Sequence, residues 1–121
     1  MKQHQSRLKS FRCAFKGIFI LIKDEANARI HLIAAVLAVV LGLFLKLNVN
    51  EWLWVVLAIF LVFIMELVNT AIENVADAVS KDYNKFLGKA KDLGAAATLL
   101  ATIFALIIAL FVFVPKILMF I

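Results

Sequence analysis

Three long apolar runs without charged residues dominate the chain. They cover residues 32–45, 52–65 and 93–114. The last run can span a bilayer by itself, because a spanning helix needs about 20 apolar residues. The first two reach that length when their polar ends are included, and no stretch alternates as a barrel strand would. The pattern therefore predicts three transmembrane helices, at about 28–47, 51–79 and 92–114.

The N-terminal segment has a different pattern, with a stripe of apolar residues along one side of a helix. Its basic residues Lys9, Arg12 and Lys16 fall on the other side. We predict an amphipathic helix over about 5–24 that lies on the membrane surface. Its basic face would meet anionic lipid headgroups or the phosphates of a nucleotide, and the pattern leaves both open. The stripe consists of Leu8, Phe11, Phe15, Ile18 and Ile22.

Composition indicates that lipid is the solvent of this chain. Of its 121 residues, 65% are hydrophobic and only 17% are charged, whereas soluble domains carry about 25% charged residues. A soluble domain of this size would have too little interior for so much apolar surface. Cys13 is the only cysteine, which excludes an intrachain disulfide and multi-cysteine zinc motifs. We expect a single all-α domain, residues 1–121, in the cytoplasmic membrane.

Lysine and arginine gather before the first span and again between the second and third spans. The connection between the first two spans has only Lys46, together with Glu51. The positive-inside rule places both basic groups in the cytoplasm, so the N-terminus would lie inside and the C-terminus outside. Pro115 is expected to end the third helix near the outer face. The basic groups are Lys2, Arg7, Lys9, Arg12, Lys16, Lys23 and Arg29, then Lys81, Lys85, Lys89 and Lys91.

A cleaved signal peptide is the competing interpretation of the first apolar run. A signal peptide ends in small residues at its cleavage site, but Lys46, Leu47 and Asn48 follow this run. We therefore expect the run to remain as a span. The net charge of +5 is then a feature of membrane topology, and nucleic acid is not an expected partner.

A ladder of polar residues marks the second span. Glu66, Asn69, Glu73 and Asp77 are spaced three, four and four residues apart, which places them on one helix face. Counting from Glu51, Glu66 lies about 22 Å deep and Glu73 about 33 Å deep, whereas the hydrocarbon core is about 30 Å thick. Such a face suits a reaction between a lipid headgroup and a soluble substrate. The alternative is a protonated Glu66, hydrogen-bonded between subunits, followed by solvated acids.

A second polar cluster precedes the first span at the membrane level of Glu73. Two carboxylates from different helices can share Mg²⁺, so Glu25 and Glu73 are candidate ligands. Glu25 and Arg29 lie one turn apart and would equally form an ion pair, and a lone His31 is more often a hydrogen-bonded interface residue than a ligand. Because the chain lacks the glycine-rich phosphate loops, any nucleotide must be held by side chains. The small residues 94–97 predict close helix packing.

These motifs resemble the small prokaryotic diacylglycerol kinase family, which includes the undecaprenol kinases. The resemblance covers most of the chain and implies a homotrimer of three-span subunits with composite active sites on the cytoplasmic side. It implies ATP-dependent phosphorylation of a membrane lipid alcohol, and the segment 27–31 favours undecaprenol over diacylglycerol. The matching motifs are Glu66-x-x-Asn69-Thr70-Ala71-Ile72-Glu73-x-x-x-Asp77, Ala90-Lys91-Asp92 and Glu25-x-Asn27-x-Arg29-x-His31.

The resemblance also implies roles for individual residues. Glu66 matches the proposed general base, and Glu25 and Glu73 match the residues that hold Mg²⁺ with ATP. Cys13 stands where relatives often have a tyrosine near the nucleotide, and a cysteine does not stack on a base in the same way. The remaining nucleotide-binding residues would be Asp77, Lys91 and Asp92. The lipid substrate would contact Glu66, Asn69, Arg29 and His31.

Two other classes of function remain compatible with the residues alone. A small oligomeric proton-coupled transporter would use Glu66 as a proton relay. A structural or adaptor membrane protein would leave the polar ladder without a purpose. Consumption of ATP that depends on a lipid substrate separates the kinase from both.

Overall fold

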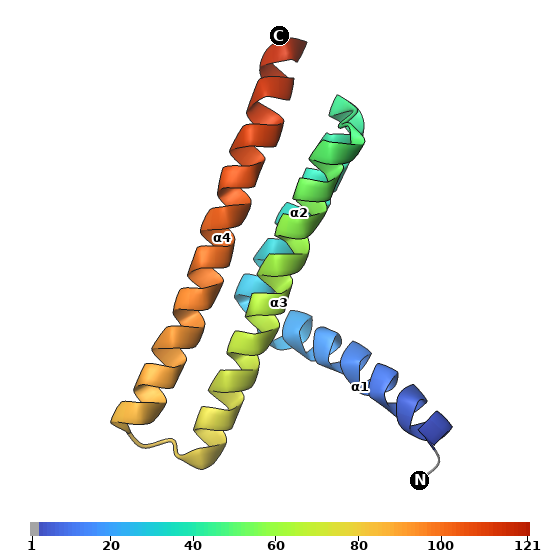
Figure 1. The fold of residues 1–121 in the computed structure, drawn as a ribbon. Coiled ribbons are helices and arrows are strands. Elements are labelled where there is room, and N and C mark those ends of the chain that lie inside the picture. The colour runs from blue at the N-terminus through green and yellow to red at the C-terminus, as the bar shows by residue number, and fades with distance from the viewer. Residues whose placement is uncertain (1–2) are drawn as a thin grey trace.

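A computed structural model describes residues 3–121 and contains four α-helices (Figure 1). They are α1 (Gln3–Asp24), α2 (Ala26–Leu45), α3 (Val49–Val79) and α4 (Lys85–Phe120). The all-helical fold is confirmed, and α2, α3 and α4 are each long and apolar enough to cross a membrane. Most of their large apolar side chains are exposed, as expected for helices that face lipid or further subunits. Lys2 of the first basic group lies outside the described residues.

The three long helices run alongside one another, whereas α1 leaves this bundle at a steep angle (Figure 1). The N-terminus and the α3–α4 connection lie at one end, here called the proximal end. The C-terminus and the α2–α3 turn lie at the opposite, distal end. Most contacts between helices join α3 to α4. With 31 residues, α3 is about 46 Å long, whereas a hydrocarbon core is about 30 Å thick.

The turn between α2 and α3 is closed by backbone and side-chain caps. Lys46 adopts a left-handed conformation with φ 56°, and its N–H donates to the carbonyls of the last turn of α2. Asn48 and Glu51 form a capping box: Glu51 N–H donates to Asn48 Oδ1 (2.8 Å), and Asn48 N–H donates to Glu51 Oε1 (2.9 Å). This reciprocal pair satisfies two backbone donors that would otherwise lack partners at the start of α3.

The final helix begins earlier than the apolar pattern predicts. It starts at Lys85 because the Asn84 side chain accepts hydrogen bonds from the backbone N–H groups of Phe86 (2.9 Å) and Leu87 (3.2 Å). An apolar run marks only the part of a helix that lies in lipid, so the apolar pattern did not predict this polar first turn. Lysines assigned to the connection between spans thus lie on helix α4.

The prediction that Pro115 ends the final helix is wrong, because α4 continues to Phe120. Proline removes only its own N–H, so the bond to the carbonyl of Phe111 is the one that is lost. Membrane helices tolerate this loss where neighbouring groups hold the chain. Here Lys116 Nζ lies 3.2 Å from Glu51 Oε1 and joins the distal turns of α3 and α4.

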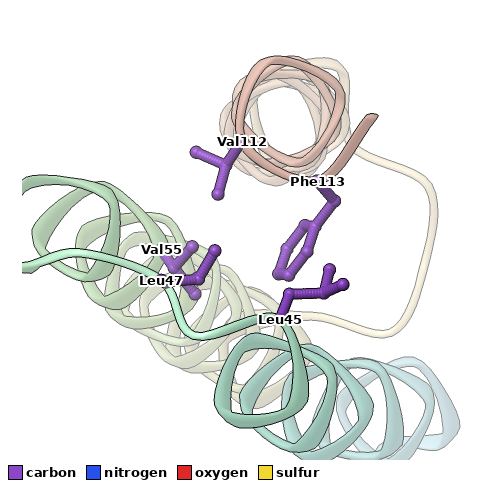
Figure 2. Packing of buried hydrophobic residues seen from close by; sticks show 5 residues of the cluster. All are labelled: Leu45, Leu47, Val55, Val112 and Phe113. Carbon is purple, nitrogen blue, oxygen red and sulfur yellow. The ribbon is translucent and has the colours of Figure 1, made fainter. Parts of the chain in front are cut away.

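A small apolar cluster holds the distal end together (Figure 2). It joins α2, the following turn, α3 and α4, so three helices meet in one place. The rings of Phe44 and Phe120 approach one another nearby, with centroids 5.2 Å apart. The cluster consists of Leu45, Leu47, Val55, Val112 and Phe113. The cluster packs the helices together at the end opposite the polar ladder, so it contributes no residue to the ladder.

The capping box predicts a measurable loss of stability on substitution. Asn48→Ala removes the side-chain acceptor at the start of α3, and loss of such a cap costs about 1 kcal/mol. We expect a lower thermal inactivation midpoint in detergent micelles. Asn50→Ala, an exposed neighbour, is the matched control and should leave the midpoint unchanged. Equal midpoints for both variants would contradict the structural role of the cap.

Candidate active site

Glu66 is the buried charged residue of the described chain, with 7% of its surface exposed. Its carboxylate meets a side chain from another helix, since His31 Nε2 on α2 lies 3.4 Å from Glu66 Oε1 on α3. Sequence analysis singled out both residues but did not pair them. Spacing along one chain predicts neighbours on one helix and carries no signal for a contact between two helices.

His31 also lines an apolar cavity of about 190 Å³ between α2, α3 and α4. Among the lining residues, Thr102 is the other polar one, and its hydroxyl already donates to the carbonyl of Thr98 (2.9 Å). The rest of the wall is aliphatic or aromatic. Since His31 lines this cavity and contacts Glu66, Glu66 lies between the apolar cavity and the rest of the polar ladder.

One turn along α3, Asn69 Nδ2 donates to Glu73 Oε1 (2.9 Å). The other amide atom, Asn69 Oδ1, is buried and has no hydrogen-bond partner within residues 3–121. Gly94 on α4 lies directly against it, so that a Cβ at position 94 would collide with this oxygen. Sequence analysis predicted close packing at residues 94–97 but missed Gly94 as a neighbour of the site.

The proximal end of the ladder joins α3 to α4. Lys91 Nζ lies 2.6 Å from Asp77 Oδ1, so two residues assigned to nucleotide binding are brought together. Their side chains are 43% and 52% exposed and are therefore open to a soluble ligand. Asp92 is also exposed. The ladder thus runs from a buried acid, Glu66, to an accessible ion pair.

The junction between α1 and α2 is fixed by Arg29. Its Nη1 donates to the carbonyl oxygens of Ile22 (3.1 Å) and Lys23 (2.7 Å), the last turn of α1. The ion pair with Glu25 that the sequence allowed is replaced by this cap, because free carbonyls at a helix end attract a cation. Glu25 is the single residue between the two helices and is half-buried, with no capping hydrogen bond from its side chain.

The donor set available for a metal is small. Within the described residues, no group of three or more His, Cys, Asp or Glu side chains is placed to hold an ion. Mg²⁺ usually needs only one or two carboxylates when substrate phosphates and water supply the other oxygens. Glu25 and Glu73 therefore stay predicted ligands for Mg²⁺ that enters with a nucleotide. Cys13 is exposed on α1 beside Arg12 and Lys16, in a shallow basic depression.

Comparison with known proteins identifies the family of this chain. The family profile of prokaryotic diacylglycerol kinase matches residues 12–113. The undecaprenol kinase of Bacillus subtilis is 34% identical over 119 residues, which cover 95% of this chain and 97% of the relative. The diacylglycerol kinase of Escherichia coli K12 is 35% identical over 100 residues, or 83% of this chain and 82% of the relative. With its buried acid, polar ladder and three apolar helices, the chain belongs to the prokaryotic diacylglycerol kinase family, a family of lipid kinases.

Proposed function

We propose that the chain transfers the γ-phosphoryl group of ATP to the hydroxyl of a membrane lipid alcohol. The observation that carries this proposal is the position of Glu66: it is buried next to an apolar space, on a face that continues to the exposed Asp77–Lys91 pair. An acceptor from the membrane and a nucleotide from water would meet along this face. The relatives named as lipid kinases support the same reaction class.

The residues divide into a nucleotide group and an acceptor group. Lys91 and Asp77 bind the nucleotide, Lys91 through a phosphate oxygen. Glu66 accepts the proton of the lipid hydroxyl, while the hydroxyl oxygen bonds to the γ-phosphorus and the bond to the bridging oxygen breaks, which releases ADP. Glu25 and Glu73 would hold Mg²⁺, which neutralises phosphate charge when it is bound with ATP. Positioning and electrostatics carry most of such a reaction, so a small scaffold suffices.

We propose undecaprenol as the preferred acceptor, with diacylglycerol as the alternative. The segment that holds Asn27, Arg29 and His31 resembles the undecaprenol kinase branch, and the match to the Bacillus subtilis undecaprenol kinase extends over nearly the whole of both chains. Overall identity does not distinguish the two, since it is 34% for that enzyme and 35% for the Escherichia coli diacylglycerol kinase. The choice therefore rests on a direct comparison of substrates.

We also propose the assembly and the topology. Phe11 and Phe15 of α1 are 68% and 69% exposed, which suits a helix that lies on the membrane surface with these rings in the lipid. Basic residues lie before α2, in the connection between α3 and α4, and on the first turns of α4. By the positive-inside rule they favour a cytoplasmic proximal end and an external C-terminus. The exposed apolar faces of α2 to α4 leave room for a homotrimer in the membrane.

Phosphoryl transfer in mixed micelles tests the function. Purified protein would be given radiolabelled ATP, Mg²⁺ and either undecaprenol or diacylglycerol in separate reactions. We expect label in undecaprenyl phosphate at several times the rate of label in phosphatidic acid. A higher rate with diacylglycerol would retain the kinase and reverse the acceptor preference. No label in either lipid, from protein with intact helical circular dichroism, would refute the kinase and revive the transporter.

A further inference from the structure

The contact between His31 and Glu66 involves the buried charged residue of the described chain. Glu66 is buried, and His31 Nε2 at 3.4 Å from Oε1 is its side-chain partner. A carboxylate removed from water loses much of the stabilisation of its charge unless a donor is supplied. The imidazole N–H of His31 is such a donor.

Other charged groups near this level already have partners. On α3, Glu73 lies two turns from Glu66 and accepts from Asn69 (2.9 Å), and Asp77 lies three turns away and pairs with Lys91 of α4. On α2, Arg29 caps α1 through two carbonyl oxygens. His31 is therefore the side chain that remains for Glu66 on the helices packed around it.

The contact with one oxygen has a consequence for the other oxygen. If Nε2–H of His31 donates to Oε1 across this 3.4 Å contact, the bond limits rotation of the carboxylate and gives Oε2 a preferred direction. Among the described residues, the ion-pair contact of Glu66 is made by Oε1. An oriented and unbound carboxylate oxygen is the arrangement that a general base requires.

We propose that His31 is the positioning residue of Glu66: it donates Nε2–H to Oε1, and it thereby directs Oε2 to the acceptor hydroxyl. This inference rests on the proposed kinase function, and it assigns His31 a role beyond contact with the lipid. The transferred hydroxyl proton goes to Oε2, and His31 keeps its own proton throughout. His31 also lines the apolar cavity, and a low local dielectric there would strengthen such a bond.

Two substitutions separate hydrogen-bond donation from size. Leucine at position 31 fills similar space and donates nothing, whereas glutamine offers an amide N–H at a similar distance along the side chain. We expect His31→Leu to lower kcat about 10- to 100-fold, the loss typical of one hydrogen bond to a charged group, with an unchanged KM for ATP. His31→Gln should restore turnover to within about threefold of the native chain.

Thr102→Val is the matched control, because it alters the same cavity wall without touching Glu66. It should retain native turnover. Native kcat in His31→Leu would overturn the proposal, and so would equal losses in the leucine and glutamine variants. A rise confined to the KM for the lipid would overturn it too, because His31 would then act on the substrate rather than on Glu66.

A spectroscopic measurement tests the same contact without turnover. Infrared difference spectra against Glu66→Gln isolate the signal of this side chain at neutral pH. We expect the stretching bands of the Glu66 carboxyl group at the same position in the native protein and in His31→Gln, and at a shifted position in His31→Leu, because loss of a hydrogen bond changes the carboxyl C–O bonds. Bands at one position in all three proteins would refute the role of His31. Because this readout does not depend on catalysis, it separates a failure of this inference from a failure of the kinase function.

Discussion

Glu66→Gln is expected to abolish most phosphoryl transfer while the protein keeps its fold. Glutamine has the shape of glutamate, and its carbonyl oxygen would take the place of Oε1 opposite His31 Nε2, so we expect the helix contact at 3.4 Å to survive. The amide does not accept the hydroxyl proton, however, and loss of a general base lowers turnover about 100-fold to 10,000-fold. The measurement is the initial rate of lipid phosphorylation at saturating ATP and acceptor.

The control for this variant is Glu51→Gln on the same helix. Glu51 lies at the distal end, where it caps α3 and pairs with Lys116. Removal of its charge should leave turnover unchanged, which excludes a general effect of acid loss in α3. A rate near that of the native protein in Glu66→Gln would remove the general-base assignment and leave the acid as a structural residue.

Gly94→Ala is expected to give the second largest effect, although position 94 bears no functional group. Its Cβ would collide with Asn69 Oδ1 and would lie 3.5 Å from Ile72 Cδ1, so α3 and α4 must separate or Asn69 must turn. If Asn69 turns, its hydrogen bond to Glu73 is lost. Overpacking of this kind costs about 1–3 kcal/mol of stability.

We expect turnover of Gly94→Ala to fall about tenfold or more, with a higher Mg²⁺ concentration needed for half-maximal rate, because the orientation of Glu73 is disturbed. Gly88→Ala is the matched control on the same helix, since nothing lies within 4 Å of a Cβ at that position. It should keep native turnover and gain up to about 1 kcal/mol from helix propensity. Identical Mg²⁺ dependence in both variants would contradict the link from Gly94 through Asn69 to Glu73.

Much of the architecture followed from hydropathy, because lipid restricts a spanning segment to an apolar helix. The second span illustrates this: its predicted range, 51–79, differs from α3 (Val49–Val79) only at the first turn. The predicted bounds of the final helix were wrong, because local interactions decide where this helix begins and ends. Asn84 starts α4 in a polar region, and Pro115 is accommodated inside a helix, and neither feature changes the apolar pattern.

The candidate site was likewise predicted only in part from the sequence. Glu66, Asn69, Glu73 and Asp77 were found from sequence because helical periodicity places them on one face. Their partners on other helices were not, since the contact with His31 depends on how α2 packs beside α3. The collision at Gly94 is likewise a property of helix separation and leaves only a weak trace in the sequence, a run of small residues.

A single residue, Glu25, joins α1 to α2, so no flexible linker separates the two helices. Glu25 N–H donates to the carbonyl of Leu21 (2.9 Å), and Arg29 N–H donates to the carbonyl of Glu25 (3.3 Å), so helical hydrogen bonds continue on both sides of the bend. Arg29 clamps the same bend from its side chain. We therefore expect a change in the tilt of α1 to displace Glu25. If α1 lies on the membrane surface as proposed, membrane thickness and headgroup charge would then alter the position of this carboxylate.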